Sequence, residues 1–488
     1  MNAGSNGNYW SSSLNTDNPN NGRNLNFNSG NVNTNNDNRN YGNSVRAVRC
    51  SPTRFSTIRS AVFQLSIPMH LSQTQLLIDL HTAYLDARRH KRSRPYQQDF
   101  EKDMAVNLRD MADQLYNRRY QPGRSICFVI EDPKKREVFA ADFRDRIVHH
   151  LYYNYTHELF ERTFIADSYS CIKKRGTHYG ISRLQKYIRQ ESLNYTEHCY
   201  ILKMDISGYF MHIDRSILLD IVLKKLAKMR RHKISVNGNE KWDYVLDFDF
   251  ISYLSQIIIT LNPTADCIFR GSRSDWDSLP YNRSLFNSPE GCGLPIGNLT
   301  SQLFSNVYLG EFDDYVKRTL RVKRYGRYVD DFFIVSNDKD YLLSLISKIE
   351  DFLAQRLHLS VNTGKTQICD SHRGVGFLGV YLKPFRLYIH NDSLRRIMFK
   401  IPRLSRIQSA EQMRSVVSSY LGVLSHCSSY HIRRRLFLPL NHVWRFGYFD
   451  RWFSSFFFIR NRLICNTSQK PLKKPSKKHQ KIFKKIWK

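Results

Sequence analysis

The sequence lacks any long apolar run. No stretch approaches the roughly 20 consecutive apolar residues that a membrane-spanning helix needs. The N-terminus is polar and has no apolar core of the kind that secretory signals carry. We therefore expect a cytoplasmic protein that has no membrane partner.

Cysteine is sparse and scattered along the chain. The nine cysteines include no Cys-x-x-Cys pair, which argues against a zinc site and against a disulfide framework. This pattern fits a reducing cytosol. The cysteines are Cys50, Cys127, Cys171, Cys199, Cys267, Cys292, Cys369, Cys427 and Cys465.

Acidic residues are few relative to basic ones. Lys and Arg total 75 against 43 Asp and Glu, which gives a formal net charge of +32 and a pI of about 9.8. Such a charge points to a polyanionic partner, nucleic acid first and an anionic membrane surface second. A chain of 488 residues has room for roughly two to four domains.

Apolar residues are also rare at both ends of the chain. Seventeen of the first 43 residues are Asn, and this composition predicts a disordered Asn-rich arm over residues 1–49. Residues 466–488 hold nine Lys and two Pro. We expect a mobile tail there that binds RNA electrostatically, with a merely solubilising tail as the alternative.

Between these ends, apolar residues recur at helical spacing. The spacing predicts core-facing helices over 71–87 and 100–115, then from 143 through 155 and over 250–261. A further helix is expected from 410, where Ser409 begins a capping box. An apolar hairpin is predicted over 126–139.

Two adjacent carboxylates, Asp330 and Asp331, interrupt the β-prone run 327–335. Burying such a pair costs several kcal/mol unless a cation neutralises it. Neighbouring side chains on a strand point to opposite faces, so both reach one site most simply at the tip of a hairpin. A divalent metal bound by oxygen ligands would then offset the repulsion. The alternative is an ordinary turn that happens to hold two Asp residues.

A second apolar strand, 200–205, ends on Asp205. Two-metal phosphoryl transfer needs carboxylates from separate strands at one point, and Asp205 with Asp330 and Asp331 would supply them. Phe210, five residues later, would pack under the sugar and exclude a 2′-hydroxyl, or else it packs in the core.

Two further segments fit phosphate and nucleotide contacts. Lys135 and Arg136 lie in the basic turn of the predicted hairpin and are candidates for gripping a triphosphate, although an ordinary charged turn is the alternative. The Gly-rich segment 291–297 precedes a helix, and glycines there let backbone N–H groups approach a nucleotide closely.

The order of these motifs resembles the palm of a reverse transcriptase: Asp205 in its strand, the Gly297 loop and helix, then Tyr328-Val329-Asp330-Asp331. Lys365 in Leu-Ser-Val-Asn-Thr-Gly-Lys-Thr resembles the lysine-bearing motif after the catalytic hairpin, and 377–382 resembles the hairpin that grips the primer. The resemblance covers roughly residues 70–440. It implies an α+β right-hand polymerase fold, with fingers, a palm containing an antiparallel sheet, and a helical thumb.

The resemblance also implies domain bounds. They are the Asn-rich arm 1–49, N-terminal helices and fingers 50–200, the palm 201–385, the thumb 386–465 and the Lys-rich tail 466–488.

One departure narrows the resemblance. Most reverse transcriptases carry Gln before the loop glycine and Pro after the Ser, where this chain has Ile296 and Gln302. The segment Ile-Gly-Asn-Leu-Thr-Ser-Gln is similar to the reverse transcriptases of diversity-generating retroelements, as are 276–286 and 419–426. That group copies a template-repeat RNA with errors opposite adenines, and the copy replaces a variable repeat in a lectin-like gene. Residues 1–49 resemble translated template repeat, because Asn is encoded by adenine-rich codons.

The family's chemistry then implies roles for these residues. Asp205 and Asp330 would bridge two Mg²⁺ ions, or Mn²⁺, with Asp331 assisting, and Lys365 would act as a general acid or as a charge. The expected partners are template RNA, a cDNA or DNA primer, dNTPs and a small basic helical accessory protein. Two alternatives are a reverse transcriptase of phage-defence or group II intron type and a non-catalytic RNA-binding protein. The residues expected to contact dNTP or template are Lys135, Arg136, Phe210, Ile296, Gly297, Gln302, Tyr328 and Lys365.

Overall fold

The computed structural model describes residues 71–89, 94–131, 134–229 and 247–458, together with the backbone of short strands outside these ranges. The chain divides into two compact units, residues 1–67 and 68–488. In the first unit the backbone of three strands pairs antiparallel in the order β1-β2-β3. These strands are β1 (Gly7–Leu14), β2 (Asn21–Asn28) and β3 (Asn31–Asn38).

Both predicted terminal segments lie outside the described residues. For the Asn-rich arm over 1–49 the structure gives only the three strand backbones, and for the Lys-rich tail over 466–488 it gives nothing. The domain bounds drawn from the sequence stay a prediction.

Three helices open the second unit, and a fourth follows a β-hairpin. Ser72 caps α1 by accepting a hydrogen bond from the Gln75 N–H, and the predicted apolar stripe of α1 is buried. The sequence predicts one helix over 100–115, and that prediction is wrong. Asp103 has φ −123° and ψ 37°, which leaves the helical region and breaks the segment into two helices. The four helices are α1 (Gln73–Arg88), α2 (Pro95–Lys102), α3 (Met104–Tyr116) and α4 (Phe143–Glu161).

The predicted basic hairpin forms two strands of a three-stranded sheet, whose order is β5-β4-β9. Strands β4 (Ser125–Ile130) and β5 (Arg136–Ala140) pair antiparallel, as the sequence predicts. Strand β9 (Cys267–Phe269) adds to β4 in parallel, from a segment more than 130 residues later in the chain. The sequence gives no sign of this third strand.

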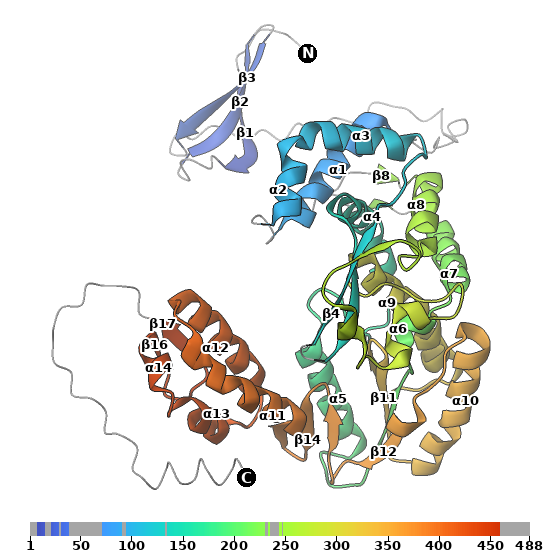
Figure 1. Cartoon of the computed structure of the whole chain (residues 1–488), viewed down its shortest axis with the longest axis vertical. Helices are drawn as coiled ribbons and strands as arrows, with labels where there is room; N and C mark the ends of the chain where they lie inside the picture. The colour runs from blue at the N-terminus through green and yellow to red at the C-terminus, as the bar shows by residue number, and fades with distance from the viewer. Residues whose placement is uncertain are drawn as a thin grey trace, which may run out of the picture. The chain divides into compact units, whose positions relative to one another are not determined.

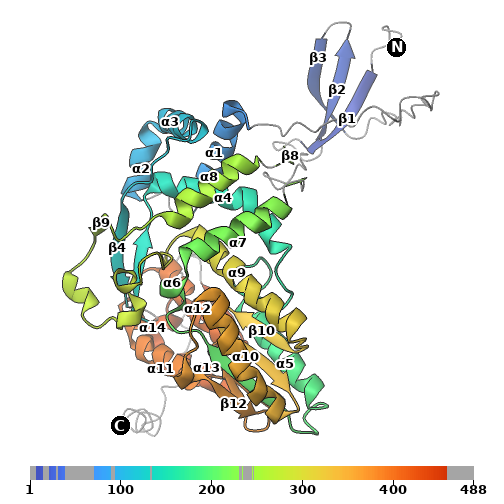
Figure 2. The ribbon, with the colours of Figure 1, turned by 90° about the vertical axis from the view of Figure 1, so that its right-hand side faces the viewer.

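A four-stranded antiparallel sheet, in the order β10-β11-β6-β12, lies beside α5 and α10 in the second unit (Figures 1 and 2). Leu202 and Phe332 point from one face into a core shared with α9 and α10. Ile201 and Phe333 point from the other face into a core shared with α5. Side chains on a strand alternate between faces, so β6 and β11 are each apolar on both faces. The elements are β6 (Tyr200–Asp205), β10 (Tyr325–Tyr328), β11 (Asp331–Ser336), β12 (Gln367–Asp370), α5 (Thr177–Glu191), α9 (Leu299–Asp314) and α10 (Lys339–Leu357).

The chain leaves the central sheet through a second antiparallel sheet, β13-β14-β15, and then becomes mainly helical. The predicted helix from 410 is α12, and Ser409 caps it by accepting from the Gln412 N–H at 3.4 Å. These C-terminal elements are β13 (Val375–Phe377), β14 (Val380–Lys383), β15 (Arg386–Ile389), α11 (Asn391–Lys400), α12 (Ala410–Leu424), α13 (Tyr430–Phe437), α14 (Asn441–Trp444), β16 (Gly447–Phe449) and β17 (Phe456–Phe458).

Three more α-helices lie in the described part of the second unit. They are α6 (Tyr209–His212), α7 (Arg215–Lys228) and α8 (Phe248–Thr260), the last of which the sequence predicts over 250–261. No helix among the described residues is long and apolar enough to cross a membrane.

Candidate active site

The two adjacent carboxylates lie at the tip of a hairpin, as the sequence predicts. Tyr328 at the end of β10 pairs with Asp331 at the start of β11, which leaves Val329 and Asp330 as a two-residue turn. Val329 has a φ of +58°, a left-handed conformation that is uncommon for a β-branched residue. Surrounding contacts must therefore hold the turn in place.

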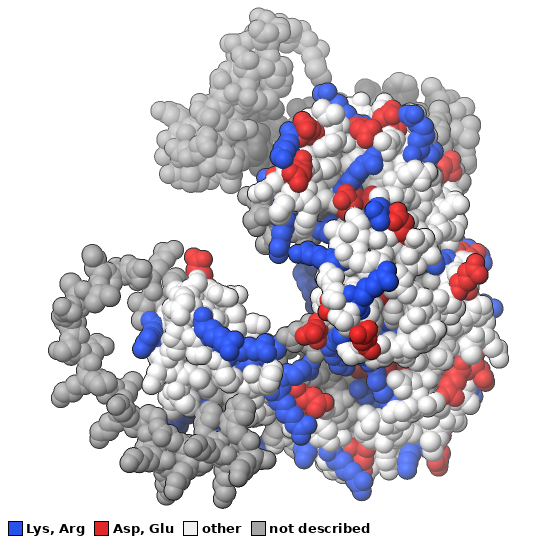
Figure 3. Space-filling view, viewed as in Figure 1, with Lys and Arg blue, Asp and Glu red and all other residues white. Residues whose placement is uncertain are grey.

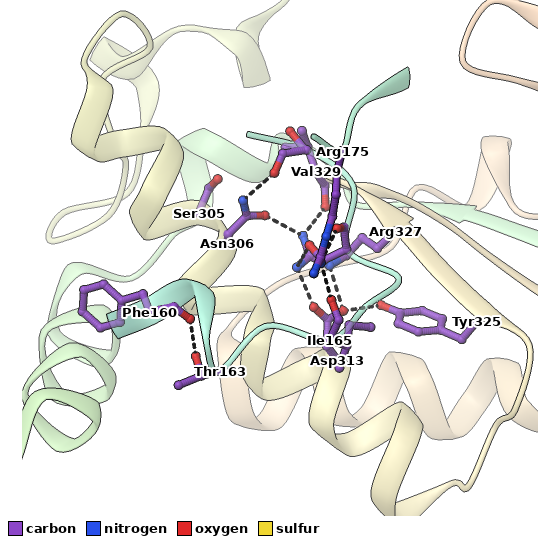
Figure 4. Close-up of polar contacts among 12 residues, drawn as sticks. Phe160, Thr163, Ile165, Arg175, Ser305, Asn306, Asp313, Tyr325, Arg327 and Val329 are labelled. Atoms are coloured by element: carbon purple, nitrogen blue, oxygen red, sulfur yellow. Dashed lines mark hydrogen bonds and ion pairs between the residues drawn. The ribbon is translucent and has the colours of Figure 1, made fainter. Parts of the chain in front are cut away.

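Arg327 is the residue that holds this turn (Figure 4). Its side chain is fully buried, and its guanidinium donates to the Val329 carbonyl at 2.9 Å. The same guanidinium donates to both carboxylate oxygens of Asp313 on α9, at 2.8 and 2.6 Å. Burial opposes the charge of Arg327, but the Asp313 carboxylate outweighs it and raises the Arg327 pKa. The turn is thus tied to α9 through a buried bidentate ion pair.

Neighbouring polar groups complete this network. Tyr325 donates its hydroxyl to Asp313 at 2.6 Å, and Asn306 on α9 donates to the Ser170 carbonyl at 2.8 Å. The Arg175 guanidinium donates to the Ile165 carbonyl at 2.7 Å, which braces the loop that runs beside Arg327. Arg327 itself also donates to Asn306 Oδ1 at 3.4 Å and to Ser168 Oγ at 3.3 Å, so the buried guanidinium joins the turn to α9 and to the loop at Ser168.

Asp205 lies directly opposite Asp331 across the β6–β11 pair. Directly opposed residues in an antiparallel pair have Cβ atoms about 4.5–5.5 Å apart. The backbone N–H of Ile206 also donates to the Asp330 carbonyl at 3.3 Å, so the end of β6 contacts the turn itself. The strand register thus brings the three carboxylates together, as the sequence predicts.

The local electrostatics disfavour three negative charges here. Burial, followed by the neighbouring charge of Asp205, raises the pKa of Asp330. Burial, together with the charges of Asp205 and Asp330, raises the pKa of Asp331 to about 6, although the Lys203 ammonium partly offsets this. Among the described residues, Asp331 Oδ1 is a buried oxygen with no hydrogen-bond partner. The site therefore favours a cation.

Two lysines contact these carboxylates. Lys365 Nζ lies 2.5 Å from Asp205 Oδ2, which places this predicted residue in the site. Lys203 Nζ lies 3.5 Å from Asp331 Oδ2. Sequence reasoning missed Lys203, although its position two residues before Asp205 on the same strand puts both side chains on one face.

The carboxylates suit a hard divalent cation such as Mg²⁺. All three offer oxygen ligands, and one of those oxygens is buried without a partner. The fit is incomplete in this conformation, because Lys365 and Lys203 contact Asp205 and Asp331. In the described part of the chain, the group of three ligands that lie within 4.8 Å of one another is elsewhere, at His198, Asp370 and His372.

The hairpin β4–β5 places only one of its two predicted residues toward the carboxylates. Arg136 is exposed, and its positive charge contributes to lowering the Asp330 pKa against the dominant effect of burial. Lys135 instead donates to Ser278 Oγ at 2.5 Å. The Lys135 ammonium is thus engaged by the segment that follows β9.

A buried carboxylate holds that segment on the hairpin. Glu137 of β5 is 1% exposed and accepts hydrogen bonds from the Trp276 indole at 2.7 Å and from Ser284 Oγ at 2.9 Å. The Leu285 N–H also donates to Glu137 at 2.6 Å. The region 276–286 is therefore folded onto the hairpin, which sequence reasoning did not anticipate.

The Gly-rich loop packs against β5. The Ile296 carbonyl accepts from the Phe139 N–H at 2.9 Å, and the Ile296 side chain packs on the small apolar cluster around Phe139. Gly297 has a φ of +132°, and a Cβ there would lie 2.7 Å from the Phe139 carbonyl oxygen, so only glycine fits. Phe210 packs on the same cluster as Ile296. Gln302 is exposed one turn into α9.

A cavity of about 850 Å³ opens beside the carboxylates, between β12, the β13–β14 hairpin and α11. Its lining combines Asp331 with basic side chains, a combination suited to a phosphate backbone beside a metal site. Figure 3 shows Lys and Arg along the hollowed face that separates the part bearing α12 from the part bearing β4. The basic residues that line the cavity are Lys134, Lys203, Arg395 and Arg396.

An antiparallel sheet with carboxylates at a hairpin tip, a basic hairpin before it and a helical region after it make up a right-hand polymerase fold, as the sequence predicts. The family model for reverse transcriptase (RNA-dependent DNA polymerase) matches residues 132–382, just over half of the chain. The chain belongs to this family. The predicted enzyme class, an RNA-directed DNA polymerase, is confirmed by this match.

Individual relatives are distant. Protein YkfC of Escherichia coli (strain K12) is 23% identical over 310 residues, which cover 57% of this chain and 71% of that protein. Apo telomerase from Candida Tropicalis matches with a TM-score of 0.41 and 13% identity, covering 66% of this chain. Telomerase from Candida albicans with a fragment of telomeric RNA matches with a TM-score of 0.40 and 11% identity, covering 67% of this chain. This chain spans 57% and 56% of those two solved chains.

Proposed function

We propose that this chain copies a template-repeat RNA into cDNA, with errors directed to template adenines, and that Asp205, Asp330 and Asp331 are its catalytic carboxylates. The observation that carries the catalytic part is the register. Asp205 lies opposite Asp331, with Asp330 in the adjoining turn, and burial raises the pKa of Asp330 and of Asp331. Such a site is completed by divalent cations, here two Mg²⁺ ions or Mn²⁺.

Each residue then has a defined task. Asp205 and Asp330 would hold the cations and Asp331 would assist, and the bound ions would supply the positive charge that activates the primer 3′-hydroxyl and neutralises the triphosphate. Arg136 is exposed toward the carboxylates and would contact the triphosphate. The Lys365 ammonium lies 2.5 Å from Asp205 and would donate a proton to the leaving pyrophosphate or stabilise its charge.

Substrate selection rests on the apolar cluster beside β5. Phe210 and Ile296 pack on this cluster, where Phe210 would lie under the sugar and exclude a 2′-hydroxyl. Ile296 offers no hydrogen bond to a template base, where most reverse transcriptases carry Gln. Together with Gln302, this substitution would relax pairing and permit errors at adenines. Gly297 lies against Phe139 of this cluster, whereas Tyr328 packs on a different apolar core and would contact the dNTP or template from the end of β10, beside the turn that holds Asp330.

The proposed partners are template RNA, a cDNA or DNA primer, dNTPs and a small basic helical accessory protein. The net charge of +32 and the basic cavity lining support a nucleic-acid partner. The template would include the RNA that encodes residues 1–49, and the product would diversify a lectin-like protein. We further propose a cytoplasmic location.

Primer extension on the RNA around codons 1–49 tests this function. The reaction contains Mg²⁺, the four dNTPs and any small basic protein encoded nearby, and the cDNA is sequenced. We expect errors concentrated at template adenines, and no cDNA from Asp330→Asn. Uniformly faithful cDNA would keep the polymerase and reject the diversification.

Two alternatives predict other outcomes. A reverse transcriptase of phage-defence or group II intron type would make faithful cDNA, and the neighbouring DNA would lack a template and variable repeat pair. A non-catalytic RNA-binding protein would make no cDNA, and its biological activity would survive replacement of the carboxylates. The family match makes this second alternative the weaker one.

A further inference from the structure

His198, Asp370 and His372 form a cluster at the end of β6 opposite to Asp205. Their ligand atoms all lie within 4.8 Å of one another. Tyr200 and Asp205 bound β6, so a strand rise of about 3.3 Å per residue puts roughly 17 Å between the two sites. This cluster is therefore separate from the carboxylate site and plays no part in the chemistry proposed for it.

The distances in the cluster match the edges of a metal coordination sphere. His198 Nδ1 lies 3.0 Å from Asp370 Oδ2, and His372 Nδ1 lies 3.5 Å from Asp370 Oδ1. Ligands at about 2.0–2.1 Å from a tetrahedral Zn²⁺ lie about 3.3 Å from each other. The three side chains thus need little movement to share one ion.

Nε2 of His372 contacts a backbone carbonyl, and this contact leaves Nδ1 as the nitrogen that can bind a metal ion. His372 Nε2 lies 3.2 Å from the Tyr195 carbonyl oxygen, which can only accept, so Nε2 carries the proton. In a neutral imidazole this leaves the Nδ1 lone pair facing the Asp370 carboxylate. Two acceptors then face each other there, and either a proton on Nδ1 or a bound metal ion can bridge them. A histidine ligand that donates its other N–H to a backbone carbonyl is the usual outer-shell arrangement of metal sites.

The backbone that presents these groups is firmly held. Asp370 ends β12 and pairs with Tyr200 of β6, and the Ser371 N–H donates to the Cys199 carbonyl at 2.9 Å. Leu193, Asn194 and Tyr195 all have a φ between +45° and +70°, a left-handed run of three residues without glycine. This run sets the direction of the Tyr195 carbonyl toward His372.

We propose that His198, Asp370 and His372 bind a divalent transition-metal ion of the Zn²⁺ type. Imidazole nitrogens favour Zn²⁺ over the oxygen-seeking Mg²⁺. His198 is 66% exposed, so water would supply the fourth ligand. The ion would join the loop after α5 to the connection between β12 and the β13–β14 hairpin. The scattered cysteines argue only against thiolate sites, and this cluster contains no thiol.

Metal titration of the full-length chain tests the proposal. The protein is stripped with a chelator, dialysed, and titrated with Zn²⁺ in excess Mg²⁺, which occupies sites made of oxygens alone. His198→Gln is compared with His358→Gln. His358 Nδ1 lies 3.1 Å from Asp214 Oδ2 and is similarly exposed, but it forms a pair rather than a trio.

We expect His198→Gln to lose one equivalent of bound Zn²⁺ and His358→Gln to lose none. Zn²⁺ should also raise the thermal midpoint of the wild-type chain and of His358→Gln by a few degrees, but not that of His198→Gln. With Co²⁺ as the probe, intense visible absorption typical of a tetrahedral site should appear in the same two proteins only. His372→Gln provides a second variant with the same expected losses. Equal Zn²⁺ stoichiometry in all four proteins, or an equal loss in both the His198 and His358 variants, would overturn the proposal.

Discussion

The two ends of β6 carry polar clusters of different chemistry. At one end Asp205 meets Asp330 and Asp331, which offer only oxygens, are largely buried and are held by Lys365 and Lys203. At the other end Asp370 meets two exposed histidines. Oxygen ligands that repel one another suit a hard ion that acts on phosphates, whereas imidazoles suit an ion that fixes the fold. The same strand would thus carry the proposed catalytic site at one end and the proposed structural metal site at the other.

The largest effect should come from neutralising the carboxylate end. Asp330→Asn removes one negative ligand, and we expect cDNA synthesis to fall on the order of 10³-fold, because several kcal/mol of charge stabilisation is lost. Single-nucleotide primer extension in Mg²⁺ measures this. Asp220→Asn, which removes an exposed carboxylate paired with Lys224 on α7, is the control and should keep the wild-type rate. Equal rates in the two variants would show that Asp330 takes no part in the reaction.

The next largest effect should come from replacing Arg327, which holds the turn that carries Asp330. Arg327→Met leaves Asp313 buried without its partner, which should lower the free energy of unfolding by about 3–5 kcal/mol. Urea unfolding followed by tryptophan fluorescence measures the change. The matched control is Arg318→Met, whose ion pair with Asp314 is on the surface and should cost less than about 1 kcal/mol. Similar losses in both variants would show that burial of the Arg327 pair carries no special weight.

A smaller effect is expected at Lys365. Lys365→Met should lower the rate of nucleotide addition roughly 10- to 100-fold while leaving dNTP binding less affected, since a general acid acts mainly in the transition state. Rapid-quench measurement of the rate against dNTP concentration separates the maximal rate of addition from the affinity for dNTP. Lys365→Arg keeps the charge and should recover part of the rate if charge alone matters. A change confined to dNTP affinity would make Lys365 a binding residue.

The smallest expected effect is on the pH dependence of stability, which reports the charge of Asp331 at the carboxylate end of β6. The folded pKa of Asp331 is raised to about 6, whereas an unfolded Asp titrates at about 4, so the folded chain binds the proton more tightly. Its stability therefore falls as the pH rises from about 4 to about 6 and stays lower above that value. In metal-free protein, Asp331→Asn should therefore be more stable than wild type by on the order of 2 kcal/mol at pH 8. The difference should fade below pH 6 and vanish near pH 4.

Added Mg²⁺ supplies the control for that experiment. It should stabilise the wild-type chain at pH 8 more than Asp331→Asn, because a bound cation offsets the repulsion that the substitution has already removed. Thermal unfolding at several pH values, with and without Mg²⁺, records both effects. A variant that is less stable than wild type at pH 8 would show that the Lys203 contact outweighs the repulsion.

Much of the fold was predictable because its signals are local. Strand alternation and the cost of burying adjacent carboxylates predicted the hairpin at Asp330 and Asp331, and apolar spacing predicted the buried stripe of α1. The break at Asp103 was missed, because both flanking segments keep the same helical spacing and only the backbone angles end the first helix. Strand β9 was missed for a different reason, since its partner β4 is far away in the sequence.

The sequence by itself determined which residue types are present in which order: three carboxylates on β-prone segments, a basic turn, a glycine that only a close approach explains, and an excess of positive charge. Only the tertiary structure decided that Lys203 faces Asp331, that Arg327 holds the turn, and that His198 meets Asp370, 172 residues away. The physical reason is that strand register and helix packing set which side chains meet, and neither leaves a periodic trace in the sequence.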